Sequence, residues 1–91
     1  MAQEELEESI KWYEKSLVGL GERFAEVIFD STEAISRNPE AYPVIKAHRR
    51  HFVVDKFPFV IVYEILKEEN MINVLHIFHT SRNPKFKFRK K

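Results

Sequence analysis

The stretch from Phe59 to Tyr63 constrains the fold of this chain more than any other. Its five residues, FVIVY, are all apolar or aromatic, whereas a strand with one face in water alternates apolar and polar side chains. Both faces of this strand therefore need cover. The strand forms the first arm of a predicted β-hairpin within residues 56–82, and a polar turn at 67–70 leads to the second arm, 71–79.

Two amphipathic helices are predicted before this hairpin. The first, over residues 4–17, carries one apolar stripe made of Leu6, Ile10, Tyr13 and Leu17. The second, over residues 22–37, has a buried side made of Phe24, Val27, Ile28, Ser31 and Ile35. The only two glycines of the chain, Gly19 and Gly21, lie between them, and so short a connection predicts an antiparallel helical hairpin.

A further strand over residues 48–54 completes the predicted sheet, which is a three-stranded antiparallel β-meander. We therefore expect one α+β domain spanning residues 1–91, with the N-terminal two-helix hairpin packed on one face of the meander and a short basic C-terminal tail at 85–91. Helices on one face leave the other face of the sheet without cover. Such an apolar face indicates an interaction site, which the tail, a second copy or a different chain would cover.

The charges are divided between the two halves of the chain. Residues 1–40 have a net charge of −6 and residues 41–91 a net charge of +7, so the two halves attract each other, and the basic half also suits phosphate or an acidic partner. The chain has no cysteine, its acidic N-terminus does not resemble a secretory signal, and no apolar run reaches membrane-spanning length. We expect a cytoplasmic protein without membrane contact.

Basic and polar side chains gather at the ends of the predicted strands. His79 and Arg82 end the last strand, whereas Arg49 and Arg50 begin the first strand of the meander. The antiparallel topology puts these two pairs at opposite ends, which favours a basic surface along the sheet over one compact catalytic cluster. Solvated charges at strand ends would produce the same pattern.

Neither a metal nor a cofactor is expected from the sequence. His76 and His79 are three residues apart, which places them on opposite faces of a strand, and the segment 48–51, HRRH, lacks the spacing of a zinc site. The tail offers two readings. Phe86 and Phe88 could stack on nucleic-acid bases beside the tail's basic residues, or fold back over the sheet.

A series of short motifs runs along the chain in a fixed order: Trp12-Tyr13, Gly19–Phe24, Asn38-Pro39, Tyr42-Pro43, Arg50, Lys56–Phe59, Tyr63 and His79–Pro84. Their order and spacing resemble the RelE/ParE superfamily of toxins from bacterial toxin–antitoxin systems. The resemblance covers nearly the whole chain and is nearest to the ParE-like, plasmid-stabilisation branch.

The resemblance implies a toxin that a cognate antitoxin holds inactive. RelE-like members cut messenger RNA on the ribosome and often carry an arginine shortly before a tyrosine on the middle strand, where this chain has Val60. ParE-like members bind and inhibit DNA gyrase and are not enzymes. We therefore expect action by protein binding, with a ribosome-dependent endoribonuclease as the alternative. The catalytic candidates for that alternative are His79, Arg82, Arg50 and Tyr63.

The expected partner contacts come from the apolar middle strand, the basic strand before it and the tail: Phe59, Ile61, Tyr63, Arg49, Arg50, Phe86 and Phe88. Members of the superfamily usually begin with a β-strand, whereas this chain enters its first helix almost at once. The resemblance therefore implies an open sheet edge, which a second copy or an antitoxin strand would pair with. A truncated or non-toxic interaction domain with the same fold is the third reading.

Overall fold

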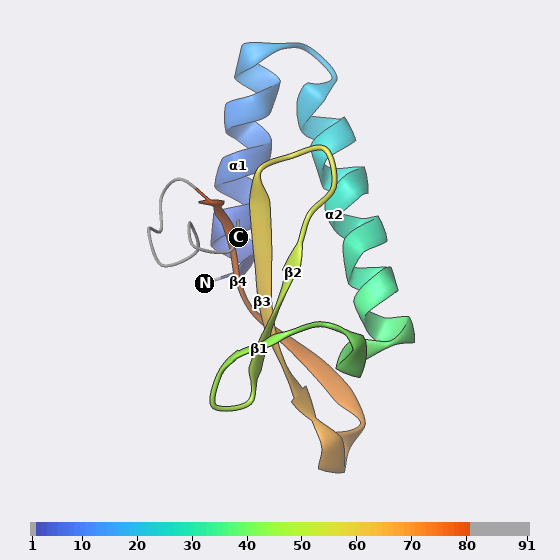
Figure 1. Ribbon diagram of the computed structural model, residues 1–91. Coiled ribbons are helices and arrows are strands. Elements are labelled where there is room, and N and C mark those ends of the chain that lie inside the picture. Colours follow the sequence, from blue (N-terminus) through green and yellow to red (C-terminus); the bar gives the residue numbers. More distant parts are fainter. Residues whose placement is uncertain (1, 81–91) are drawn as a thin grey trace.

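The computed structural model describes residues 2–80, so the predictions made for Arg82, Phe86 and Phe88 lie outside the described part. The elements follow one another as α1 (Ala2–Ser16), α2 (Leu20–Arg37), a 3-10 turn η1 (Pro39–Ala41), β1 (Val44–Lys46), β2 (Arg49–Val53), β3 (Phe59–Leu66), a second 3-10 turn η2 (Lys67–Glu69) and β4 (Met71–His79). All neighbouring strands pair antiparallel in the order β1-β2-β3-β4 (Figure 1).

The predicted α+β class and the helical hairpin are confirmed, but the sheet has four strands rather than three. The additional strand, β1, pairs with β2 through Val44 opposite Arg50 and Lys46 opposite Arg49. A two-residue turn at Ala47 and His48 joins the two strands, and Ala47 takes a positive φ of 53°. Hairpin turns of this kind usually contain Gly or Asn, so the sequence carries no turn signal at this point.

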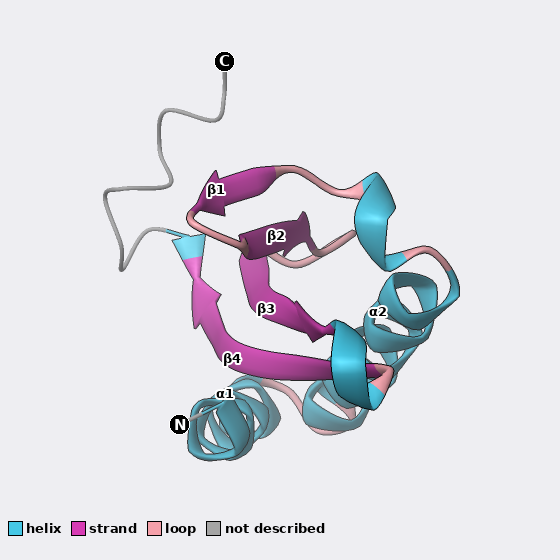
Figure 2. Ribbon diagram, turned by 90° about the horizontal axis from the view of Figure 1, so that it is seen from below, coloured by secondary structure: helices cyan, strands magenta, loops and turns pink. Residues whose placement is uncertain are grey.

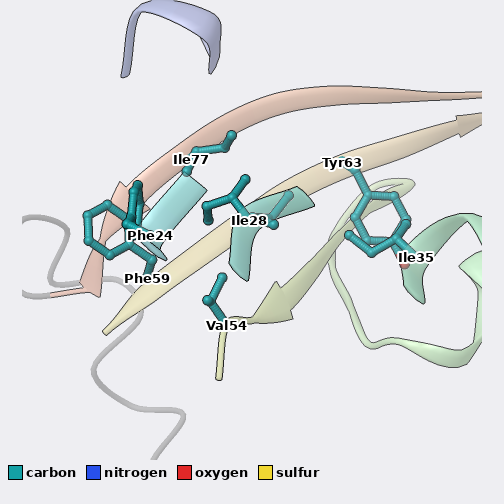
Figure 3. Packing of buried hydrophobic residues seen from close by; sticks show 8 residues of the cluster. Phe24, Ile28, Ile35, Val54, Phe59, Tyr63 and Ile77 are labelled. Atoms are coloured by element: carbon teal, nitrogen blue, oxygen red, sulfur yellow. The ribbon is translucent and has the colours of Figure 1, made fainter. Parts of the chain in front are cut away.

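The main core lies between the two helices and one face of the sheet. Figure 3 shows its buried side chains, which are Phe24, Ile28 and Ile35 of α2, Phe59, Ile61 and Tyr63 of β3, and Val54 and Ile77. At one end of this core the rings of Tyr13, Phe24, Phe57 and Phe59 form an aromatic cluster. Its closest pair, Phe24 and Phe59, has ring centroids 4.8 Å apart. Aromatic packing therefore fixes the helical hairpin on β3.

The second face of the sheet carries a smaller apolar cluster. Val60 and Val62 of β3 are buried there, together with partly buried Ile45, Leu75 and Phe78. Both faces of β3 are therefore buried, and the expectation that its second face lies uncovered is wrong for Val60 and Val62, which are 0% and 4% exposed. The sheet is curved, and Figure 2 shows α2 on its outer side and α1 beside β4, so the helices cover only the face that carries the main core.

The connection between the helices depends on both glycines. Gly19 has a φ of 90°, and a Cβ on Gly21 would lie 2.6 Å from the carbonyl oxygen of Ile10. The carboxylate of Glu14 accepts hydrogen bonds from the amides of Gly19 and Gly21, each at 3.0 Å. Glu14 therefore holds the start of α2 against the last turns of α1.

Candidate functional site

Helix α1 lies along the outer edge of strand β4. The amide of Ile77 points away from β3 and donates a hydrogen bond of 2.9 Å to Glu5 Oε1, and Glu5 Oε2 lies 3.3 Å from His76 Nδ1. The carboxylate of Glu5 thus takes the place at this amide that a carbonyl of a further strand would take. The predicted open edge is therefore capped at Ile77 by the chain's own first helix.

The sequence gives no sign of this role for Glu5. An acidic residue in the first turn of a helix is already explained by the helix dipole, and the bonded amide lies 72 residues away in the chain. His76 has this carboxylate as its partner and is partly buried.

Arg50 and Tyr63, two of the catalytic candidates, hold the turn that follows α2. Arg50 Nη1 donates to the carbonyl oxygens of Tyr42 and Glu40 at 2.6 and 3.2 Å. The hydroxyl of Tyr63 donates to the carbonyl oxygen of Pro39 at 2.6 Å. Burial raises the pKa of the Tyr63 hydroxyl, while the positive charge of Arg50 acts in the opposite direction. Both side chains are thus bonded to the main chain of residues 39–42.

The candidates do not form one cluster. Arg49 and Arg50 lie opposite Glu64 and Tyr63 on β3, whereas His79 lies opposite Phe59 at the other end of that strand. This register confirms the predicted separation. His79 is partly buried, and the centroid of its ring lies 5.3 Å from that of Phe59.

The partner contacts predicted for Phe59, Ile61 and Tyr63 disagree with the structure. All three side chains are buried beneath the helices in the main core. Every residue from 59 to 63 is apolar or aromatic, so the sequence pattern did not predict whether residues 59, 61 and 63 or residues 60 and 62 face the helices. The opposite set, Val60 and Val62, faces the second apolar cluster.

The second face of the sheet combines this apolar cluster with basic and histidine side chains. The strand register places exposed Arg49, buried His51 and exposed Val53 on the same face as Val62. His48 Nε2 lies 3.9 Å from the carboxylate of Glu64. The basic residue Arg49 therefore lies beside apolar side chains on the face that the helices leave uncovered, an arrangement suited to binding an acidic or amphipathic partner.

Within residues 2–80, no group of three or more His, Asp or Glu side chains is placed to hold a metal ion. Neither helix of the described part is long and apolar enough to cross a membrane.

One family model matches residues 1–84 of the chain, and its description is "ParE toxin of type II toxin-antitoxin system, parDE". The match includes every described residue and confirms the resemblance found in the sequence. No curated relative matches the chain.

Proposed function

The chain belongs to the ParE toxin family of type II toxin–antitoxin systems, and on this premise we propose that it is a toxin that acts by binding a target protein. A cognate antitoxin neutralises it, as in a plasmid-stabilisation module of the bacterial cytoplasm. The observation that carries this proposal is the family match over residues 1–84. DNA gyrase is the proposed target, because the ParE branch inhibits that enzyme.

Two features favour binding over RNA cleavage. Arg50 Nη1 and the hydroxyl of Tyr63 donate to main-chain carbonyls of residues 39–42, so the Tyr63 proton and one nitrogen of Arg50 already serve to hold the turn after α2. Val60 stands where the ribonuclease branch often has an arginine, and its side chain is buried in an apolar cluster. RelE-type cleavage of messenger RNA is the alternative, with His79 and Arg82 as its remaining candidates.

The proposed protein contacts are the second face of the sheet, which the helices do not cover, and the edge of β4, which α1 caps at Ile77. We assign the antitoxin to the second face of the sheet, around exposed Val53 and Arg49, because antitoxin segments that are apolar and acidic would complement it. A homodimer through the edge of β4 is part of the same proposal. The other edge strand, β1, has only three residues and an irregular register with β2, which limits strand pairing there.

A pair of assays on the purified protein tests the proposed activity. Gyrase supercoiling should be inhibited, while translation in a cell-free extract should continue without codon-specific cleavage of the message. Adding the protein encoded by an adjacent acidic reading frame should restore supercoiling. Cleavage of the message that is lost on His79→Ala would establish the ribonuclease alternative instead, and the absence of both effects would establish the non-toxic interaction domain.

A further inference from the structure

A groove of about 470 Å³ runs between the two helices, with strand β4 beneath it. Helix α1 contributes Leu6 and Glu7 to one wall, α2 contributes Phe29 and Thr32 to the other, and Ile77 of β4 also lines it. Most of the lining is apolar, and Phe29 is 61% exposed. An aromatic side chain that lines a groove and is still exposed leaves apolar surface for a further segment to cover.

The charge of the protein is divided into three parts that follow its elements. Residues 2–37, which include both helices, contain nine acidic and four basic side chains and have a net charge of −5. Residues 38–80, which include the sheet, contain five of each kind and have no net charge. The C-terminal segment 81–91 contains six basic side chains and no acidic one. The helical layer is therefore the part of the described chain whose net charge is opposite to that of this segment.

The groove lies in the most acidic part of the helical layer. Its walls belong to two stretches without a basic residue, since residues 2–10 contain four acidic side chains and residues 24–36 contain three. Glu7 lines the groove, and exposed Glu26 and Glu33 lie about one turn before and after Phe29 on α2. The groove is thus apolar inside and acidic at its rim.

The C-terminal segment has the complementary pattern. In residues 85–91, KFKFRKK, two phenylalanines alternate with basic residues. An extended chain would direct Phe86 and Phe88 to one side and the basic side chains of residues 85, 87 and 89 to the other. Aromatic rings can then enter an apolar groove while the positive charges stay at an acidic rim.

The segment starts close enough to reach the groove. The described chain ends at Thr80, directly after β4, which runs beside α1 (Figures 1 and 2). Phe86 and Phe88 follow six and eight residues later, so an extended chain brings them up to about 20 and 26 Å from Thr80. A path around α1, whose diameter with side chains is about 10–12 Å, is therefore within reach.

The outer side of α1 is acidic along this path. Glu5 faces β4, where it binds the amide of Ile77, and Glu7 faces the groove. The helical repeat places exposed Glu4 and Glu8 between these two positions, on the side away from the core. The basic segment would thus pass acidic side chains from the edge of β4 to the groove.

We propose that this groove binds the C-terminal segment of the same chain, with Phe86 and Phe88 packed against Phe29 and the basic residues beside the acidic rim. The segment then covers apolar surface between the helices and ties the end of the chain to α1 and α2. Phe86 and Phe88 are occupied within the chain, rather than free to stack on nucleic acid or to bind a partner. The proposal goes beyond the proposed function and does not depend on it.

Disulfide formation between two introduced cysteines tests this docking, because the chain has no cysteine of its own. Gln3→Cys places a thiol on an exposed residue that lines the groove, and Lys87→Cys places the other between the two phenylalanines. Each disulfide that forms reduces one glutathione disulfide to two glutathione thiols. The equilibrium with glutathione therefore gives the effective concentration of one protein thiol at the other. We expect Phe86→Ala with Phe88→Ala to lower that concentration about tenfold, because the aromatic contact is lost.

The groove side is tested in the same cysteine pair. Phe29→Ala should lower the effective concentration to a similar extent, and Glu26→Lys with Glu33→Lys should lower it too. Val53→Ala is the matched control, because Val53 is another exposed apolar residue, at 57%, but lies on the second face of the sheet. It should leave the effective concentration unchanged.

Unfolding midpoints identify any variant that fails to fold, and Thr32→Cys on the opposite wall of the groove replaces Gln3→Cys as a second pair. Four results would overturn the proposal. The effective concentration could be the same with and without the two phenylalanines. It could be insensitive to both the Phe29 and the charge-reversal variants. It could fall with Val53→Ala and not with Phe29→Ala, which would place the segment on the sheet. Finally, the disulfides could join two chains, which would make a second copy the occupant.

Discussion

Three side chains of this protein each hold a segment that is distant in sequence. Glu5 binds the amide of Ile77, and Arg50 and Tyr63 bind carbonyls in the turn after α2. The carbonyls at the end of a helix lack helical partners, and this turn directly follows such an end. Polar residues that look suited to chemistry therefore serve here to fix main-chain segments to the sheet.

The hydroxyl of Tyr63 makes one partly buried hydrogen bond, to the carbonyl oxygen of Pro39. Tyr63→Phe keeps the ring and leaves that carbonyl without this donor, so we expect a loss of about 1 kcal/mol in the free energy of unfolding. Urea unfolding of both proteins measures it. Tyr13→Phe is the control, because no hydrogen bond joins its hydroxyl to another described residue, and an equal loss in both variants would contradict the assignment.

Two tyrosines also make the free energy of unfolding depend on pH in the alkaline range. Burial raises the pKa of Tyr63 and of Tyr13 above the ordinary value of 10.0. The unfolded chain therefore releases these protons at lower pH than the folded one, so the contribution to stability is complete below about pH 10 and is lost as pH rises through the folded pKa. We expect the unfolding free energy to fall above that pH. Tyr63→Phe should make this fall in unfolding free energy shallower, as measured by urea unfolding at a series of pH values between 8 and 11. A Tyr63→Phe protein whose unfolding free energy falls as steeply with pH as that of the wild type would contradict the prediction.

At the level of the elements, the periodicity of apolar residues predicted the features that depend on one element alone, such as its type and its core face. The spacing of Ile10 and Tyr13, and that of Phe24 and Ile28, identified both helices and their core faces. Contacts between elements could not be predicted from this periodicity. Three features depend on how one element is placed relative to another, and no local sequence pattern contains that information. They are the choice of which alternate side chains of β3 face the helices, the exposure of Leu17, and the bond between Glu5 and Ile77.

The close crossing of the helices at Gly21 yields a prediction about their hairpin. A methyl group there would lie 2.6 Å from the carbonyl oxygen of Ile10, which is main chain and cannot turn aside, and 2.9 Å from Glu14 Oε1. Gly21→Ala should therefore separate the helices and cost about 1–3 kcal/mol in unfolding free energy. Thermal unfolding followed by circular dichroism measures this cost.

Gly19 provides the comparison for this prediction. A Cβ there would have no atom within 4 Å, but its φ of 90° disfavours L-residues other than Asn and Asp. Gly19→Asn should thus be tolerated better than Gly21→Ala. The reverse order would mean that the turn, and not the helix crossing, limits the stability of the hairpin.

At the level of the whole molecule, the helical hairpin is placed differently at its two ends relative to the sheet. The turn between the helices projects beyond the sheet, while the start of α1 covers the edge of β4 (Figures 1 and 2). One end of the hairpin thereby lies outside the sheet, and the other closes an edge that would otherwise attract a partner. Association through β4 therefore requires the start of α1, with Glu5, to leave this edge.

This requirement predicts how Glu5 controls the proposed dimer. Glu5→Ala removes the acceptor from the amide of Ile77 and the partner of His76, so the edge gains an unpaired donor that a second β4 strand can satisfy. We expect the dimer to form at a lower protein concentration than in the wild type, measured by size-exclusion chromatography with light scattering across a dilution series. Glu8→Ala changes an exposed glutamate one turn along the same helix and should leave the equilibrium unchanged. A Glu5→Ala protein that stays as monomeric as the Glu8→Ala protein at high concentration would contradict the control of the dimer by Glu5.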